Sequence, residues 1–312
     1  MPPDRPSSRK AKPPSPPQDS DPALPELSAE RFPVVGIGAS AGGLEAFTQL
    51  LSHVPLDTGM AFVLVQHLDP SQKSLLSEIL ARTTRMPVHE AQEGMAIAPN
   101  RVYVIPPNVS MTLVQGCLHL TVRERAQKVS KAIDTFFHSL AAERGDRAIA
   151  VVLSGGDDDG TRGLEAVKAA GGITFAQSED SAQVSSMPHM AIASGLVDFI
   201  LDPEAIAAEL ANISRHPYVT TAAPSPPKEE PPEQTDAIST IFALLQSSFG
   251  VNFTHYKRTT LQRRILRRMA LHRLERPDEY TRHLQGNPTE VQALYEEILP
   301  GQETGRTAPG QN

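Results

Sequence analysis

Short apolar segments alternate with amphipathic segments from residue 32 to residue 213, and this alternation constrains the fold most strongly. Each apolar segment is nearly continuous, which is typical of strands buried on both faces. The expected strands are Val34–Ile37, Ala61–Val65, Val102–Ile105, Ala148–Leu153, Ile173–Ala176 and Leu196–Ile200. The expected helices lie near 42–53, 71–83, 131–144, 160–170 and 202–213. This order predicts an α/β domain with a mostly parallel, doubly wound sheet covered by helices on both faces.

Two further segments depart from that alternation. Met111–Val122 has Gln115-Gly116 between two apolar stretches, and it predicts an antiparallel hairpin added to the sheet. Residues 236–299 have the pattern of helices alone, so a small all-α domain is expected to follow the α/β domain.

Composition sets the domain boundaries. The chain has 28 prolines in 312 residues, and they are unevenly placed. Residues 1–31 are rich in Pro and Ser and are expected to be disordered, because they bury too little apolar surface to offset chain entropy. Residues 216–235 are a Pro/Glu-rich, semi-rigid linker, and 300–312 are a disordered tail. The expected domains are therefore 32–215 and 236–299.

Bulk properties exclude several classes of protein. The net charge of −7 makes nucleic acid an unlikely partner for the whole chain. Because Cys117 is the single cysteine, an internal disulfide and a cysteine-based metal site are both excluded. No apolar run approaches the ~18 residues of a membrane span, so we expect no membrane insertion and a cytoplasmic location.

The Gly-rich turn after the first expected strand carries two overlapping motifs. Gly38-Ala-Ser40-Ala-Gly42 fits G-x-S-x-G, the turn that presents a nucleophilic serine. Gly36-x-Gly38-x-x-Ala41 fits the turn that holds a dinucleotide pyrophosphate. The dinucleotide interpretation needs an acid at the end of the second strand, and His67 occupies that place. The histidine at that strand end therefore favours the interpretation of the motif as a turn that presents a nucleophilic serine.

Polar side chains follow three of the expected strands. Ser40 ends the first strand, His67 ends the second, and Asp157-Asp-Asp159 lies in the loop after the strand at 148–153. Because the carboxyl ends of parallel strands share one edge of a sheet, these groups are expected to converge as a nucleophile, a base and an orienting acid. Plainer roles remain open: Ser40 as a turn former, His67 as a structural residue, and the aspartates as helix caps or cation ligands.

Several motifs together give a specific resemblance. Gly-Ile-Gly-Ala-Ser40-Ala-Gly-Gly, Val-Gln-His67-Leu, Arg101-Val-Tyr-Val-Ile-Pro-Pro-Asn108, Ile133-Asp-Thr-Phe-Phe-His-Ser139 and Leu-Ser-Gly-Gly-Asp-Asp-Asp159-Gly160 resemble the catalytic domain of the chemotaxis-receptor protein-glutamate methylesterases. The resemblance implies a Ser40–His67–Asp159 triad that hydrolyses glutamate methyl esters on chemoreceptor helices and deamidates glutamines there. No cofactor and no metal is expected. The usual N-terminal receiver domain is missing from the pattern, so activation by phosphorylation in cis is not expected.

Both lines of reasoning give the same mechanism. Ser40 attacks the ester carbonyl with His67 as general base, and water then hydrolyses the acyl-enzyme. Backbone N–H groups near Ala41 are expected to stabilise the oxyanion, and the Gly155 and Gly156 backbone is expected to approach the substrate closely. Many family members carry a Met in place of Gly156 and a less acidic loop than Asp157-Asp158.

Residues 236–299 resemble the N-terminal helical domain of the chemotaxis-receptor glutamate methyltransferases, most clearly in Tyr256–His272. Fusions of the two enzymes have this order. No S-adenosylmethionine domain follows, so methyltransferase activity is not expected. The resemblance implies that Arg263, Arg264, Arg267 and Arg268 are partner-binding residues, facing a methyl-accepting chemoreceptor or a similar signalling protein. A solvated helix face without a partner, and nucleic-acid binding, remain open for the same arginines. The alternative function is a non-catalytic receptor-binding adaptor of a two-component system.

Overall fold

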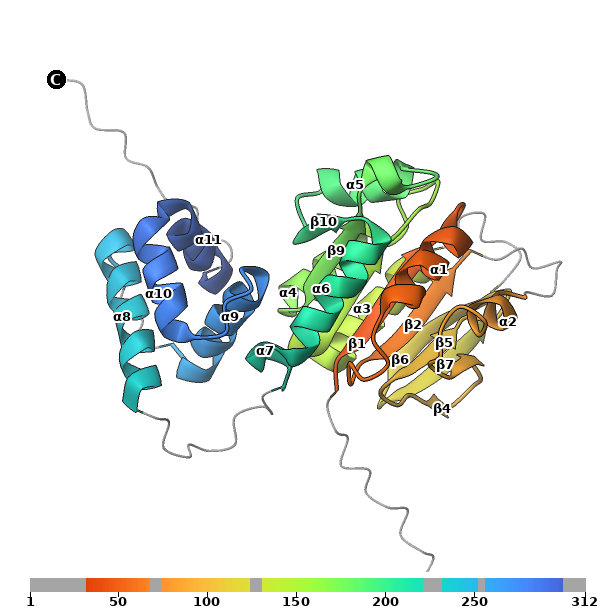
Figure 1. Ribbon diagram of the computed structural model, residues 1–312, viewed down its shortest axis with the longest axis horizontal. Coiled ribbons are helices and arrows are strands. Elements are labelled where there is room, and N and C mark those ends of the chain that lie inside the picture. The colour runs from red at the N-terminus through yellow and green to blue at the C-terminus, as the bar shows by residue number, and fades with distance from the viewer. Residues whose placement is uncertain (1–31, 68–74, 124–130, 221–231, 252–255, 300–312) are drawn as a thin grey trace, which may run out of the picture. The chain divides into compact units, whose positions relative to one another are not determined.

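The computed structural model describes residues 32–67, 75–123, 131–220, 232–251 and 256–299 (Figure 1). The expected disordered segments 1–31 and 300–312 lie outside the described residues. Seven strands form the main sheet, in the order β10-β9-β8-β1-β2-β5-β3, and every neighbouring pair is parallel. Its strands are β1 (Val34–Ala39), β2 (Ala61–Gln66), β3 (Val88–Glu90), β5 (Arg101–Val104), β8 (Ala148–Val152), β9 (Ile173–Gln177) and β10 (Phe199–Leu201). The doubly wound parallel sheet expected from the sequence is confirmed.

Helices cover both faces of this sheet. On one face α1 (Gly43–His53) and α6 (Pro203–Arg215) lie side by side, as Figure 1 shows, and they pack on Val35 and Ile37 of β1. On the other face lie α3 (Ala132–Arg144), α4 (Thr161–Ala169) and α5 (Ser186–Ala193). Residues of one strand alternate between the two apolar cores, which is the period-two pattern of a strand buried on both sides.

The expected hairpin forms, but its expected attachment to the main sheet is wrong. β6 (Val109–Val114) and β7 (Cys117–Val122) pair antiparallel, and β7 pairs with β4 (Met95–Ala96) in a separate three-stranded sheet. The edge of the main sheet is already taken by β3, which pairs with β5. The hairpin packs on α3 instead, where the Leu113 amide donates to Ser139 Oγ at 3.0 Å.

The remaining helices are shorter or lie after the α/β domain. α2 (Leu76–Leu80) occupies part of the helix expected over 71–83. The segment 216–235 is not wholly extended, because Pro217–Thr220 form α7 and α8 begins at Pro232; residues 221–231 lie outside the described part of the chain. The four helices of 236–299 are α8 (Pro232–Phe249), α9 (Arg258–Leu271), α10 (Pro277–Gly286) and α11 (Pro288–Ile298).

The all-α segment has an apolar core of its own. Ile241 and Leu245 of α8 meet Ile265 and Met269 of α9, and Leu294 of α11 completes the cluster. The four-residue spacing along α8 and α9 places these side chains on one face of each helix. Among the described helices, none is long and apolar enough to cross a membrane.

Candidate active site

The three polar strand ends lie next to one another because β8, β1 and β2 are adjacent in the sheet. β1 pairs with β2 from Val34↔Ala61 to Ala39↔Gln66, so Ser40 and His67 follow paired residues. β8 flanks β1 on the other side, and the loop after it carries Asp159. The topology therefore gathers the hydroxyl, imidazole and carboxylate groups at one edge, as the sequence predicts.

Hydrogen bonds and a glycine fix the turn that carries Ser40. The Ser40 amide donates to the Ser154 carbonyl at 2.9 Å, and the Gly43 amide donates to the Ser40 carbonyl at 2.9 Å. Gly42 has φ 78°, and a Cβ there would lie 2.5 Å from Ser154 Oγ. Both the left-handed backbone and this close approach require glycine at position 42.

His67 is held by the buried Asp159 carboxylate. His67 Nε2 lies 2.7 Å from Asp159 Oδ2, and the Asp159 residue is 0% exposed. The N-terminus of α3 also binds this carboxylate, since the Ile133 amide donates to Oδ2 at 3.0 Å and the Asp134 amide to Oδ1 at 2.9 Å. Unpaired amides at a helix N-terminus favour a negative charge. Asp159 is therefore held by two backbone amides in a place where it orients the imidazole.

The Asp134 carboxylate binds the N-terminus of α4 in the same way as Asp159 binds that of α3. Its Oδ1 accepts from the amides of Gly160 and Gly163, both at 2.9 Å, in the first turn of α4. Burial raises the pKa of the Asp134 carboxyl above its usual value, and the neighbouring Asp159 charge adds to that rise. The aspartate at the start of each of these helices thus accepts hydrogen bonds from amides at the start of the other helix. These bonds hold the Asp159 loop against both α3 and α4.

The second nitrogen of His67 faces a different acid. His67 Nδ1 lies 3.4 Å from Asp157 Oδ2, while Asp157 Oδ1 accepts from the Asp159 amide at 3.1 Å. Within the described residues Ser40 Oγ makes no hydrogen bond. Because Nε2 is bonded to Asp159, Nδ1 is the imidazole nitrogen left for a further partner.

An open cleft of about 710 Å³ lies over the serine turn. Its walls come from the turn itself, from the start of α1 and from the end of β2. The lining residues that bear polar side chains are Ser40, Glu45, Thr48, Gln66, His67 and Gln183. The cleft gives an extended side chain access to Ser40 and His67 together.

The three expected oxyanion residues have different surroundings. Within the described residues the Ala41 amide makes no hydrogen bond. The Gly155 amide donates to the Val184 carbonyl at 2.9 Å, and a Cβ at Gly155 would lie 2.7 Å from the Met187 side chain. Among the described residues, no atom of a residue beyond the chain neighbours lies within 4 Å of the place that a Cβ at Gly156 would take. Gly155 is therefore a packing position whose amide is already used.

The four expected partner-binding arginines each face a carboxylate of this chain: Arg263 faces Asp146, Arg264 faces Glu297, Arg267 faces Asp198 and Arg268 faces Glu290. Arg267 is 2% exposed and also donates to the Gly172 carbonyl at 3.0 Å. A contact between Arg267 and a partner would require these ion pairs to open.

Sequence reasoning assigned no role to two residues that shape the site, although both lie in the motifs that carry the family resemblance. Asp134 belongs to Ile133-Asp-Thr-Phe-Phe-His-Ser139, and Ser154 belongs to Leu-Ser-Gly-Gly-Asp-Asp-Asp159-Gly160. Ser154 is 0% exposed, and its Oγ donates to the Ala41 carbonyl at 2.7 Å and accepts from the Val184 amide at 3.0 Å. The motifs and the place of each residue at an element end were the signals that could have found these roles.

Family models match both halves of the chain. A model described as CheB methylesterase matches residues 35–210. A model described as CheR methyltransferase, all-alpha domain, matches residues 236–299.

Relatives and solved structures agree with the first match. Protein-glutamate methylesterase/protein-glutamine glutaminase 2 of Pseudomonas aeruginosa is 36% identical over 206 residues, which are 65% of this chain and 57% of that protein. An uncharacterised 104.1 kDa protein of Rhodobacter capsulatus is 38% identical over 242 residues, 72% of this chain and 25% of that protein. The crystal structure of the Thermotoga maritima CheB methylesterase catalytic domain has a TM-score of 0.55 and 28% identity, covering 58% of this chain and 98% of that one. The chain spans little more than half of the first relative and a quarter of the second.

Replacing Ser154 by alanine tests the anchoring of the serine turn. The change leaves the Ala41 carbonyl and the Val184 amide without their buried partner, so we expect unfolding free energy to fall by about 1–3 kcal/mol. Urea unfolding followed by circular dichroism measures this. Ser52→Ala is the control, because its hydroxyl is exposed on α1, and it should change stability by less than about 0.5 kcal/mol. Equal stabilities for the two variants would contradict the anchoring role.

Proposed function

Since the chain belongs to the CheB methylesterase family, we propose that it is a serine hydrolase that demethylates glutamate methyl esters on chemoreceptor signalling helices. Deamidation of glutamine side chains is the second activity proposed for the same site. The observation that carries the proposal is the bond between His67 Nε2 and the buried Asp159 carboxylate, next to the turn that presents Ser40. The names of the relatives support the reaction class.

In the proposed reaction His67 Nδ1 takes the Ser40 proton as Ser40 Oγ attacks the ester carbonyl. The imidazolium then gives that proton to the departing methoxide, so methanol leaves and an acyl-enzyme remains. His67 next removes a proton from water as the water oxygen attacks the acyl carbon. The bond from that carbon to Ser40 Oγ then breaks, the imidazolium returns the proton to Ser40 Oγ, and the glutamate carboxylate is released. The buried charge of Asp159 stabilises the imidazolium in both steps.

Backbone amides next to the nucleophile are proposed to bind the oxyanion. The Ala41 amide follows Ser40 directly and begins the turn into α1, where helix N-terminal amides favour negative charge. Gly156 is the second proposed donor, since the Gly155 amide is already bonded to Val184. One oxyanion donor is worth roughly 3 kcal/mol of transition-state stabilisation.

The adaptor function is the less favoured alternative. It depends on the arginines of α9 being available to a partner, whereas their guanidinium groups face carboxylates of the same chain. The proposed partner is a methyl-accepting chemoreceptor that reaches the cleft over Ser40.

Release of methanol from a methylated chemoreceptor cytoplasmic domain tests the reaction. Ser40→Ala and His67→Gln should each lower the rate at least about a thousandfold, because each removes a group that the proposed covalent step requires. Ser52→Ala, on the exposed side of α1, should keep the wild-type rate. A Ser40→Ala protein that releases methanol at the rate of Ser52→Ala would exclude the proposed mechanism.

A further inference from the structure

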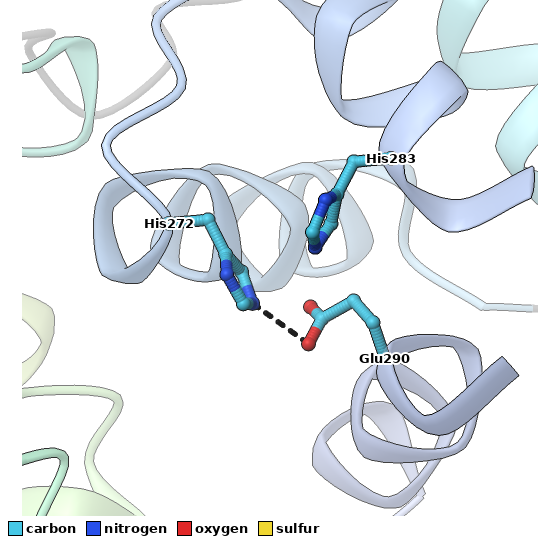
Figure 2. A group of neighbouring side chains, drawn as sticks. All are labelled: His272, His283 and Glu290. Carbon is cyan, nitrogen blue, oxygen red and sulfur yellow. Dashed lines mark ion pairs between the residues drawn. The ribbon is translucent and has the colours of Figure 1, made fainter. Parts of the chain in front are cut away.

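A group of metal-ligating side chains lies in the all-α segment, away from the catalytic strand ends. His272 follows the last residue of α9, His283 belongs to α10, and Glu290 is in the first turn of α11. Within the described residues, one ligand atom of each lies within 4.8 Å of the other two. Figure 2 shows the two imidazoles and the carboxylate pointing toward one another, from α10, from α11 and from the residue that follows α9.

The distances come close to those of a first-row metal site. His272 Nε2 lies 2.7 Å from Glu290 Oε2, and the two imidazole rings have centroids 4.6 Å apart. Ligand atoms of a tetrahedral Zn²⁺ site, with bonds of about 2.0–2.1 Å, are about 3.3 Å apart. The His272–Glu290 pair therefore has to open by about 0.6 Å, and His283 has to move inward. Both are side-chain adjustments.

The ion pair between His272 and Glu290 does not account for the buried side chain of His283. His283 Nε2 is fully buried and has no hydrogen-bond partner within the described residues. A buried polar nitrogen without a partner costs free energy, and it needs a specific reason. A cation shared with His272 and Glu290 would give this nitrogen a ligand bond.

The other neighbours of Glu290 leave one oxygen for a metal. Oε1 accepts from Arg268 Nε at 2.9 Å and from the Tyr280 hydroxyl at 2.7 Å, which orients the carboxylate. Oε2 faces His272 and the second Arg268 nitrogen, Nη2. A metal on Oε2 replaces the Nη2 contact and leaves both bonds to Oε1, which are the outer interactions that position a metal-bound carboxylate.

The charges around the group do not exclude a divalent cation. Arg268 is the positive neighbour, and Glu297 Oε2 lies 3.9 Å from its Nη1. Glu290 and Glu297 both face Arg268, whose Nη2 also lies 3.4 Å from His272 Nε2, so a metal bound to His272 and Glu290 displaces Nη2 from both ligand atoms.

We propose that His272, His283 and Glu290 bind one Zn²⁺ ion that links α9, α10 and α11. Two imidazole nitrogens and one carboxylate oxygen are ligands that Zn²⁺ takes in proteins, with a water in the fourth position. The ion adds bonds to three segments of the chain and leaves both hydrogen bonds to Glu290 Oε1 in place, so it stabilises the all-α segment. The sequence gives no hint of the site, because the ligands follow no recurrent metal-binding spacing.

Zinc titration of the full chain tests the site. Protein first treated with a chelator is titrated with Zn²⁺ alone in competition with a chromogenic chelator. His283→Gln is the main variant, because His283 Nε2 makes no hydrogen bond that the change would remove. His189→Gln is the matched control, since His189 also pairs with a glutamate, Glu179, at 3.0 Å but belongs to no such group of three.

The wild type and His189→Gln should each bind one Zn²⁺ ion with the same affinity. His283→Gln should bind Zn²⁺ at least about tenfold more weakly. His272→Gln should show the same loss, which guards against a folding defect in a single variant. Co²⁺ in place of Zn²⁺ should give the visible absorption of a four-coordinate ion in the wild type, and that absorption should be lost in both variants. Absence of zinc binding by the wild type, or equal affinity of the wild type and both variants, would overturn the site.

Discussion

The exchange of two aspartates between helix N-termini is the interaction on which the catalytic geometry depends. Asp159 stands just before α4 and accepts from two amides of α3, while Asp134 belongs to α3 and accepts from two amides of the α4 turn. Each carboxylate satisfies amides that a helix leaves unpaired. Because the exchange is reciprocal, neither loop can move without breaking bonds at both helices. The Asp159 charge is thereby fixed 2.7 Å from His67.

The sheet supplies the rest of the arrangement. Strand β1 lies between β8 and β2, so the residues that follow these three strands share one edge. Glycines permit the tight packing there: a Cβ on Gly38 would lie 2.4 Å from the Ile133 side chain, directly beside the α3 amides that hold Asp159. Helix α3 can approach β1 closely because position 38 has no side chain. The Ser40 turn, His67 and Asp159 are thus placed by backbone that is buried or hydrogen-bonded.

Much of this arrangement is readable in the sequence, and the rest depends on tertiary contacts. The near-continuous apolar strands predict the parallel sheet, and their polar ends identify Ser40, His67 and the aspartate loop. The attachment of the hairpin was predicted wrongly, because the short strand β3 that occupies the sheet edge has no strong pattern. Asp134 and Ser154 bond to segments distant in the chain, so their roles follow only from the fold. The same holds for His272, His283 and Glu290, which meet through three helices.

The central claim is that Ser40 is a nucleophile activated by His67. Covalent labelling with a serine-directed fluorophosphonate, followed by mass-spectrometric mapping of the modified residue, tests it most directly. The account predicts a single label on Ser40 whose rate of formation falls sharply in His67→Gln, in protein that remains folded. No label on Ser40, or labelling at an unchanged rate without the imidazole, would contradict it.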